Sequence, residues 1–390
     1  MKQNIRSILV FFCLVCFLLS GCKSADTNNV CKENSFTHSD YDKILKKEGS
    51  LDNVIDFKKE FCAGYLGNNE ILVNEYDTNI LKIVNIDSGS QKKITSLIND
   101  DNRYMCSWRF RGGWFVWSED LEADLFVGES IGKNWALKAF NIYTKETITI
   151  DKEPADFPKE RSFFATPISF SVDAGGAVYK CYRQHNGNLY ETINYINFAS
   201  KDNITVDEVL YKENDKNQVK LDTPYVCNNS IFYGKYKMGD KYTEGTSYIY
   251  DIKSKKSKQI DRDMLFEPLA NKEKIVAIEK TKTVDTNSSV VIMDYNGKIC
   301  NKITDAMYTN EKDKPTQFEE LKLCNNYVAW HNVKGTQLNV FNISDNIMYD
   351  IFNYNSGRAA VNIELFDNNF LLWSEWAENN RAVHNYVILK

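Results

Sequence analysis

The sequence predicts an all-β protein built from seven copies of one sheet module, and three observations support this. A nine-residue phrase, in which a turn dipeptide leads into a mainly apolar strand, recurs seven times. Tyr and Phe, which favour strands, are abundant at 22 residues each, whereas Pro is scarce at 6. Successive phrases begin 43 to 63 residues apart, a period typical of folds made of repeated supersecondary units.

The recurring phrase is expected to be the second strand of a β-hairpin. It opens with Asn-Asn or Gly-Gly in six of its seven copies. Both residue types tolerate positive φ, which a two-residue type I′ turn requires at both central positions. The seven copies are NNEILVNEY from Asn68, GGWFVWSED from Gly112, GGAVYKCYR from Gly175, NNSIFYGKY from Asn228, KEKIVAIEK from Lys272, NNYVAWHNV from Asn325 and NNFLLWSEW from Asn368.

Each phrase is flanked by further strand candidates. A first strand precedes it, at 61–66, 105–110, 168–172, 221–226, 265–269, 318–323 and 361–366. A third strand ending at or near Asn or Asp, residues suited to a turn, follows at 81–86, 137–142, 192–197, 247–252, 290–295 and 338–343. Fourth strands come next, for example at 92–98, 146–150 and 346–351.

Four antiparallel strands at this period, repeated seven times, indicate a seven-bladed β-propeller of four-stranded antiparallel blades. The seventh copy reaches only a third strand, near 383–389, before the sequence ends. We expect the last blade to be completed by an N-terminal strand from 41–57, because that pairing removes an open sheet edge. The predicted propeller therefore spans residues 41–390.

The repeats resemble those of bacterial TolB-like propellers, in which a short apolar strand with Trp or Ser precedes a strand that ends in Asp or Asn. The resemblance covers about residues 60–390 and implies the architecture but no activity. The signature motifs of WD, kelch and Tyr-Trp-Thr-Asp propellers are missing from the sequence, and seven copies exceed the six blades of TolB.

The N-terminal segment resembles a bacterial lipoprotein signal. Lys2 and Arg6 precede an apolar run at 8–19, and Leu19-Ser20-Gly21 leads to Cys22. The resemblance implies removal of residues 1–21, acylation of Cys22 by diacylglycerol and palmitate, and a lipidated tether at 22–40. The protein would then lie on the extracytoplasmic side of the cell membrane, with membrane lipid as a partner through Cys22. The alternative is an ordinary signal peptide with an incidental Cys.

Charge and cysteine content exclude several classes of site. The net charge of −5, without a basic stripe, argues against a nucleic-acid partner. Beyond Cys22 the mature chain keeps an odd number of cysteines and no Cys-x-x-Cys pair, so neither a disulfide framework nor a zinc site is predicted. We therefore expect no metal and no cofactor.

Loop lengths distinguish the two faces of the predicted ring. Turns between first and second strands, and between third and fourth strands, are short. The other connections are long and lie at 119–134, 152–167, 237–245, 280–289, 305–316 and 377–385. Long loops gathered on one face favour ligand binding there, and the alternative is variation in solvated loops that bind nothing.

Acidic residues recur at the end of the phrase nearest the long loops. Its eighth position holds Glu75, Glu119, Glu279 and Glu375, with Asn332 in the sixth copy. Such carboxylates are candidates for binding a cation or a hydroxyl-rich ligand, or for acid–base catalysis, unless they simply end each strand in water. Trp376, next to a long loop, is a candidate stacking platform, whereas Trp117, Trp330 and Trp373 are expected to pack between blades.

Three functions are compatible with this sequence. The first is a membrane-anchored binding or scaffold module for an envelope protein, peptide or glycan. The second is an extracellular glycan-active enzyme, a hydrolase or lyase, that uses carboxylates among Glu75, Glu119 and Glu375. The third is a packing role in a larger lipoprotein complex. No catalytic residue is assigned, because the Gly-x-Ser-x-Gly match at 128–132 lacks the strand-to-helix setting that this motif needs.

Overall fold

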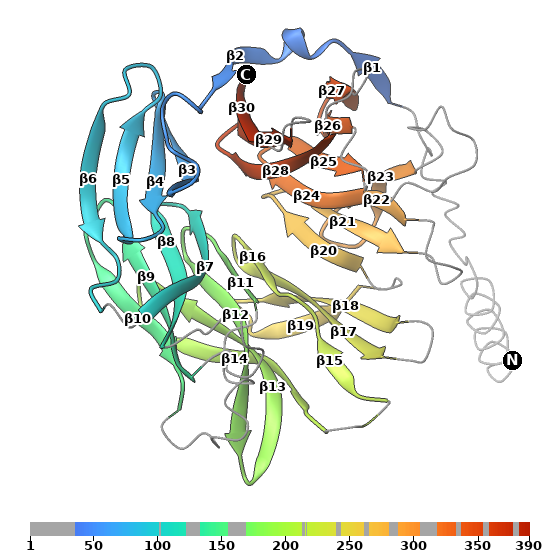
Figure 1. Ribbon diagram of the computed structural model, residues 1–390. Helices are drawn as coiled ribbons and strands as arrows, with labels where there is room; N and C mark the ends of the chain where they lie inside the picture. The colour runs from blue at the N-terminus through green and yellow to red at the C-terminus, as the bar shows by residue number, and fades with distance from the viewer. Residues whose placement is uncertain are drawn as a thin grey trace, which may run out of the picture.

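The computed structural model of the chain is a ring of seven antiparallel sheets (Figure 1), which confirms the predicted seven-bladed propeller. It describes residues 36–100, 103–121, 133–154, 169–212, 215, 217–238, 243–260, 265–280, 288–304, 318–332, 337–353, 359–376 and 382–390. Apart from one turn of 3-10 helix, η1 (Tyr41–Lys43), the regular elements of these residues are all strands.

The first four blades follow the predicted order of strands. Blade one holds β3 (Glu60–Gly67), β4 (Glu70–Glu75), β5 (Ile80–Asn85) and β6 (Gln91–Ser96). Blade two holds β7 (Arg103–Arg111), β8 (Trp114–Leu121), β9 (Lys133–Asn141) and β10 (Thr147–Lys152). Blade three holds β11 (Ser169–Val172), β12 (Gly176–His185), β13 (Asn188–Asn197) and β14 (Asn203–Leu210). In blade four, β15 (Val219–Leu221) and β16 (Tyr225–Cys227) both pair with β17 (Ser230–Met238), followed by β18 (Thr243–Asp251) and β19 (Lys256–Gln259).

The last three blades repeat this pattern. Blade five holds β20 (Leu265–Ala270), β21 (Ile275–Lys280), β22 (Ser288–Met293) and β23 (Ile299–Thr304). Blade six holds β24 (Phe318–Cys324), β25 (Tyr327–Asn332), β26 (Gln337–Asn342) and β27 (Ile347–Asn353), and blade seven holds β28 (Ala359–Asp367), β29 (Phe370–Trp376) and β30 (Ala382–Leu389). The first strand of each blade contacts the first strands of its neighbours, so these strands line the ring axis.

The core of the molecule is divided among the blade interfaces. Seven hydrophobic clusters are present, and each joins side chains of two neighbouring blades. Trp117 and Trp330 are each 1% exposed and Trp373 is 6% exposed, within three of these clusters. The expectation that tryptophans of the repeat phrase pack between blades is confirmed.

The hairpin between the first and second strands is tight in most blades. Both residues of the turn dipeptide have positive φ at Asn68–Asn69, Gly112–Gly113 and Asn368–Asn369, as a type I′ turn requires. In blade three the expected turn is wrong, because Gly175 and Gly176 lack positive φ. There the Asp173 carboxylate accepts hydrogen bonds from the backbone N–H groups of Gly175 (2.8 Å) and Gly176 (3.0 Å), so a side chain organises the bend.

The ring closes as the sequence predicts. β2 (Leu45–Ser50) pairs antiparallel with β30 and becomes the fourth strand of blade seven. After β2, Leu51 is fully buried in the cluster between blades seven and one, beside Tyr386 and Phe370. The segment from near the N-terminus therefore contributes both an edge strand and a core side chain to the closing interface.

An additional strand precedes β2. β1 (Thr37–Ser39) lies within the segment 22–40 that was expected to be a tether, and it pairs in parallel with β27 on the outer edge of blade six. Phe36 explains this attachment, because its ring packs edge-on against Phe341 at 5.9 Å between centroids. Figure 1 shows β1 and β2 running over the rims of two neighbouring blades.

Removing the buried side chain of Leu51 should weaken ring closure. We expect Leu51→Ala to lower the free energy of unfolding by about 2–5 kcal/mol, since a fully buried Leu leaves a cavity. Leu210→Ala, at a side chain that is 39% exposed, is the matched control and should change it by about 0.5 kcal/mol or less. Equal denaturation midpoints for the two variants would show that this segment does not hold the ring.

Candidate functional site

The predicted site residue Glu119 is fully buried inside blade two. Its carboxylate accepts a hydrogen bond from Trp117 Nε1 at 3.1 Å and forms ion pairs with Arg103 Nη1 at 3.3 Å and Lys138 Nζ at 2.5 Å. All four residues lie on neighbouring strands of one sheet. The described contacts of Glu119 are therefore within its own blade.

Glu375 repeats the arrangement in blade seven. It is 6% exposed and accepts hydrogen bonds from Trp373 Nε1 at 2.9 Å and Asn385 Nδ2 at 3.0 Å. Residues two apart on a strand point to the same face, so the indole reaches the carboxylate two positions on. The shared Trp-Ser-Glu sequence therefore encodes a buried indole–carboxylate hydrogen bond in both blades.

Glu75 and Glu279 also form ion pairs with lysines of their own blades. Glu75 accepts hydrogen bonds from Thr78 Oγ1 at 2.6 Å and Lys82 Nζ at 3.0 Å, and these two contacts lower the pKa of its carboxyl. Glu279 forms an ion pair with Lys302 Nζ at 2.7 Å. The same position of the repeat is thus occupied by a carboxylate bound within the sheet in four blades.

The structure does not show these carboxylates meeting around a common ligand. Trp376 ends β29, and its side chain lies outside the described residues, as does that of Asn332. Most of the long loops, the Gly-x-Ser-x-Gly segment 128–132 and Cys22 also fall outside the described residues. A ligand on the long-loop face, with Glu75, Glu119, Glu279, Glu375 and Trp376 around it, stays a prediction.

The buried contacts of Glu119 predict a structural effect of its removal. Glu119→Ala should lower the free energy of unfolding by about 1–3 kcal/mol, because it leaves the Trp117 indole and two cations without their acceptor. The matched control is Glu273→Ala, whose side chain is 63% exposed, with an expected change of about 0.5 kcal/mol or less. Unfolding curves that superimpose for both variants would contradict the structural role.

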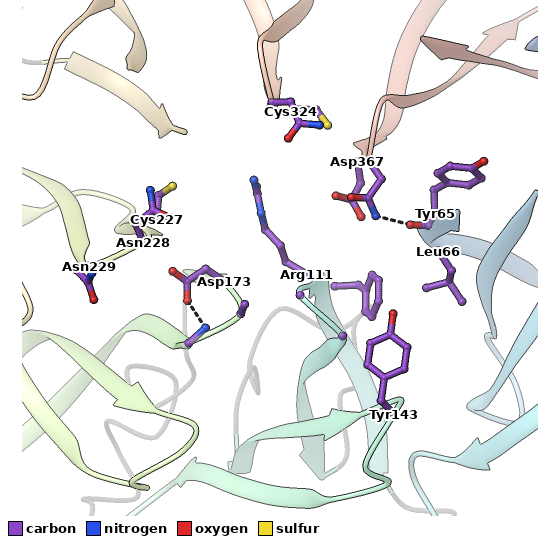
Figure 2. A pocket seen from close by; sticks show the side chains of 17 residues that line it. Tyr65, Leu66, Arg111, Tyr143, Asp173, Cys227, Asn228, Asn229, Cys324 and Asp367 are labelled. Carbon is purple, nitrogen blue, oxygen red and sulfur yellow. Dashed lines mark hydrogen bonds between the residues drawn. The ribbon is translucent and has the colours of Figure 1, made fainter. Parts of the chain in front are cut away.

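The described residues form a cavity of about 490 Å³ at the ring axis. Its lining comes from the ends of first strands and from the short hairpins that follow them, so it opens on the hairpin face, opposite the long loops. Figure 2 shows the side chains around this axial pocket, which come from blades one, two, three, four, six and seven. The chemically active members are Arg111, Asp173 and Asp367.

Arg111 ends β7 and extends across the axis. Its Nη1 donates a hydrogen bond to the hydroxyl of Tyr225 in blade four at 3.1 Å. The main influence on the pKa of Arg111 is the Tyr225 hydroxyl, which raises it. Burial lowers this pKa, and the Asp367 carboxyl raises it further. The next residue, Gly112, has a positive φ, which glycine adopts without strain. A Cβ at this position would lie 2.5 Å from Ala174 Cα, because blades two and three touch beside the pocket.

Two carboxyl groups flank this guanidinium. Asp173 is buried at the end of β11, and burial raises its pKa although the N–H groups of Gly175 and Gly176 oppose the shift. Asp367 ends β28 in blade seven, and burial raises its pKa to about 6 although Arg111 acts in the opposite direction. Among the described residues, no ion pair joins Arg111 to either carboxyl. The pocket therefore holds one cation and two acids that come from three different blades.

The two thiols of the pocket add no charge. Cys227 and Cys324 are buried free cysteines, and burial raises the pKa of each thiol to about 11. At neutral pH both are protonated and weakly polar. The polarity of the pocket is consequently set by Arg111 and the two Asp residues.

Sequence reasoning missed this pocket because it followed loop length. The residue directly before the turn dipeptide points toward the ring axis, and in blades two and seven that residue is Arg111 and Asp367. A charged residue at a position otherwise held by Gly, Ala, Cys or Asn was the available signal. This signal is visible when the seven copies of the repeat phrase are placed one above another.

Comparison with known proteins gives the fold and no closer relationship. No protein family and no curated protein matches the sequence. The β-propeller domain of the Trilobed protease from Pyrococcus furiosus is similar in structure at 10% identity, with a TM-score of 0.55 and coverage of 84% of this chain and 95% of that one. An acylaminoacyl peptidase from Pyrococcus horikoshii matches 79% of this chain and 47% of its own length at 11% identity, with a TM-score of 0.51.

The chain thus spans about half the length of that peptidase. TolB from Acinetobacter baumannii is among the similar structures too, at 12% identity and a TM-score of 0.37, covering 85% of this chain and 64% of TolB. Identities this low show the fold alone. The propeller architecture expected from the repeats is confirmed by the ring of seven sheets.

Proposed function

We propose that this protein is a membrane-anchored extracytoplasmic lipoprotein whose propeller binds a polar group of an envelope protein, peptide or glycan in the axial pocket. One observation carries the proposal. A guanidinium has five N–H donors, and Arg111 uses one of them, toward Tyr225, among the described residues. The remaining donors line a cavity of about 490 Å³.

The partly buried Arg111 donors that face the cavity favour a ligand there. A carboxylate can accept two parallel N–H groups of one guanidinium, and such charge-assisted hydrogen bonds are stronger than neutral ones. A bound acceptor would satisfy the remaining N–H groups of Arg111. Small-ligand sites in proteins usually have volumes of about 300–1,000 Å³, and the axial pocket falls in that range.

A binding module is better supported than a glycan-active enzyme. Glycoside hydrolysis needs two carboxyls about 5–5.5 Å or about 6.5–9.5 Å apart, with one of them available as an acid. The carboxylates considered for that role, Glu75, Glu119 and Glu375, accept hydrogen bonds within their own blades. Their bonds favour a structural role, and the ligand is assigned to the axial pocket instead.

The path of the N-terminal strand supports placing the pocket near the membrane. Thr37 pairs with Ile347 at the start of β27, directly after the turn that closes blade six on the hairpin face. The proposed tether from Cys22 to Phe36 would reach at most about 50 Å when fully extended. Among the described residues, no helix is long and apolar enough to cross a membrane.

Anchoring through Cys22 is tested by substitution in a bacterial cell. We expect the wild-type chain to incorporate labelled palmitate and to sediment with membranes, whereas Cys22→Ala should do neither, because acyl chains supply the membrane affinity. Cys31→Ala is the matched control and should behave as wild type. Membrane sedimentation of Cys22→Ala at the wild-type level would contradict lipid anchoring.

Binding in the axial pocket is tested on the detergent-solubilised full chain. A panel of amino acids, dipeptides, neutral sugars and uronic acids is screened by thermal shift, and hits are measured by titration calorimetry. Arg111→Met should weaken any genuine hit at least about tenfold, because a charge-assisted hydrogen bond is worth about 1.5–3 kcal/mol. Lys272→Met, at a side chain on the same face that is 81% exposed, should leave binding unchanged. Hits whose affinity is the same for Arg111→Met and the wild type would show that the ligand binds outside the axial pocket.

A further inference from the structure

We infer that the axial pocket takes a small zwitterion of the α-amino-acid type, with its carboxylate on Arg111 and its ammonium group on Asp173 and Asp367. The inference rests on the proposed function, since it names the ligand class of the same pocket. It follows from the charges, the hydrogen-bonding capacity and the layout of the three side chains.

The charges in the pocket favour a ligand that carries both signs. A purely anionic ligand that reached Arg111 would also meet the carboxyls of Asp173 and Asp367, and like charges repel in a site removed from water. A purely cationic ligand would meet Arg111. The Cys227 and Cys324 thiols are protonated and compensate neither charge. A ligand that carries both signs matches the pocket without repulsion.

The hydrogen-bonding groups of the pocket also differ between its two sides, with donors on one side and acceptors on the other. Arg111 offers N–H donors on one side. On the other side, the Asp173 carboxylate accepts the Gly175 and Gly176 N–H groups through Oδ1, and the backbone of Asn228 also hydrogen-bonds to this carboxyl. A carboxylate supplies acceptors for the guanidinium, and an ammonium group supplies three donors for the carboxyls. Neutral hydroxyls would satisfy the hydrogen bonds but would bring no charge of their own to any of the three side chains.

Arg111, Asp173 and Asp367 line the same cavity. Figure 2 shows the Arg111 guanidinium between Asp173 on one side and Asp367 on the other. In an α-amino acid the carboxylate and ammonium groups are carried by the same carbon atom, so a ligand on Arg111 also faces a neighbouring Asp. Phe110, Leu66 and the Tyr143 ring provide apolar wall for a side chain.

The model of recognition predicts how affinity depends on pH. Asp367 interacts electrostatically with Arg111 from β7, with the Cys62 thiol from β3 and with the Cys324 thiol from β24. Burial raises the pKa of Asp367 to about 6, so its carboxyl is mostly neutral at pH 5 and mostly ionised at pH 7.5. An ammonium group favours the ionised form, and affinity should therefore increase as the pH rises through 6. An anionic ligand would show the opposite slope.

The experiment is titration calorimetry of the detergent-solubilised full chain with glycine, L-leucine and L-glutamine at pH 5 and pH 7.5. Each amino acid is compared with its N-acetyl derivative, which lacks the ammonium group, and its amide, which lacks the carboxylate. We expect the amino acids to bind at least about tenfold more tightly than either derivative and more tightly at pH 7.5. Asp367→Asn should reduce the pH dependence, Arg111→Met should weaken binding at least about tenfold, and Lys272→Met should change neither.

The outcomes separate this inference from the proposed function. Arg111-dependent binding of a neutral sugar, a simple carboxylate or a uronic acid, with no binding of the amino acids, overturns the zwitterion and leaves the binding pocket in place. Absence of any Arg111-dependent ligand in the panel overturns both. Thermal unfolding of each variant is recorded first, and Asp173→Asn replaces Asp367→Asn if the latter does not fold.

Discussion

The structure depends on one strand pairing, that of β2 with β30. A propeller blade has a long apolar first and second strand, and it is stable only when neighbours cover both of its faces. Blade seven lacks a fourth strand of its own, and β2 supplies it while Leu51 fills the adjoining interface. Once that pairing forms, the described residues of each blade pack against both neighbouring blades.

Ring closure also fixes the groups at the axis. The hairpins that follow the first strands are tight, and several are tied to the next blade by asparagine side chains. Asn271 Nδ2 donates to the Asn325 carbonyl, Asn325 Nδ2 donates to Asn369 Oδ1 at 2.9 Å, and Asn368 Nδ2 donates to the Tyr65 carbonyl at 2.7 Å. Asparagine therefore has two roles in these hairpins, since it accepts positive φ and links blades. Side chains that end the first strands are held by this framework, which lowers the entropy lost when a ligand binds.

The sequence was sufficient for the fold because the fold is periodic. The repeat phrase marked the second strand of each blade, and the missing strand of blade seven pointed to an N-terminal partner. Details set by a single side chain were not predictable. The Asp173 carboxylate replaces the expected Gly-Gly turn in blade three, and Phe36 attaches β1 to blade six. Glu119 was identified by its position in the repeat phrase, but the structure was needed to show that Trp117, Arg103 and Lys138 surround its carboxylate.

The distribution of buried charge explains why the axis differs from the rest of the molecule. Within the described part of the sheets, several charged side chains that leave water form ion pairs, whereas Asp120, which is 1% exposed, forms none with the described residues. Lys82 lies between Glu60 and Glu75, Lys180 meets Glu191 at 3.3 Å, and Glu119 meets Lys138.

Each of these pairs joins strands of one blade, so its geometry is set when that blade forms. Arg111, Asp173 and Asp367 belong to three blades, and they come together only when the ring is complete. Ring closure leaves them without ion pairs to one another, although an arginine and two carboxyls face the same cavity. Arg111 and the two carboxyls interact electrostatically across the cavity, but they do not come within ion-pair distance of one another. A ligand that supplies the missing opposite charges gives a physical reason for this arrangement.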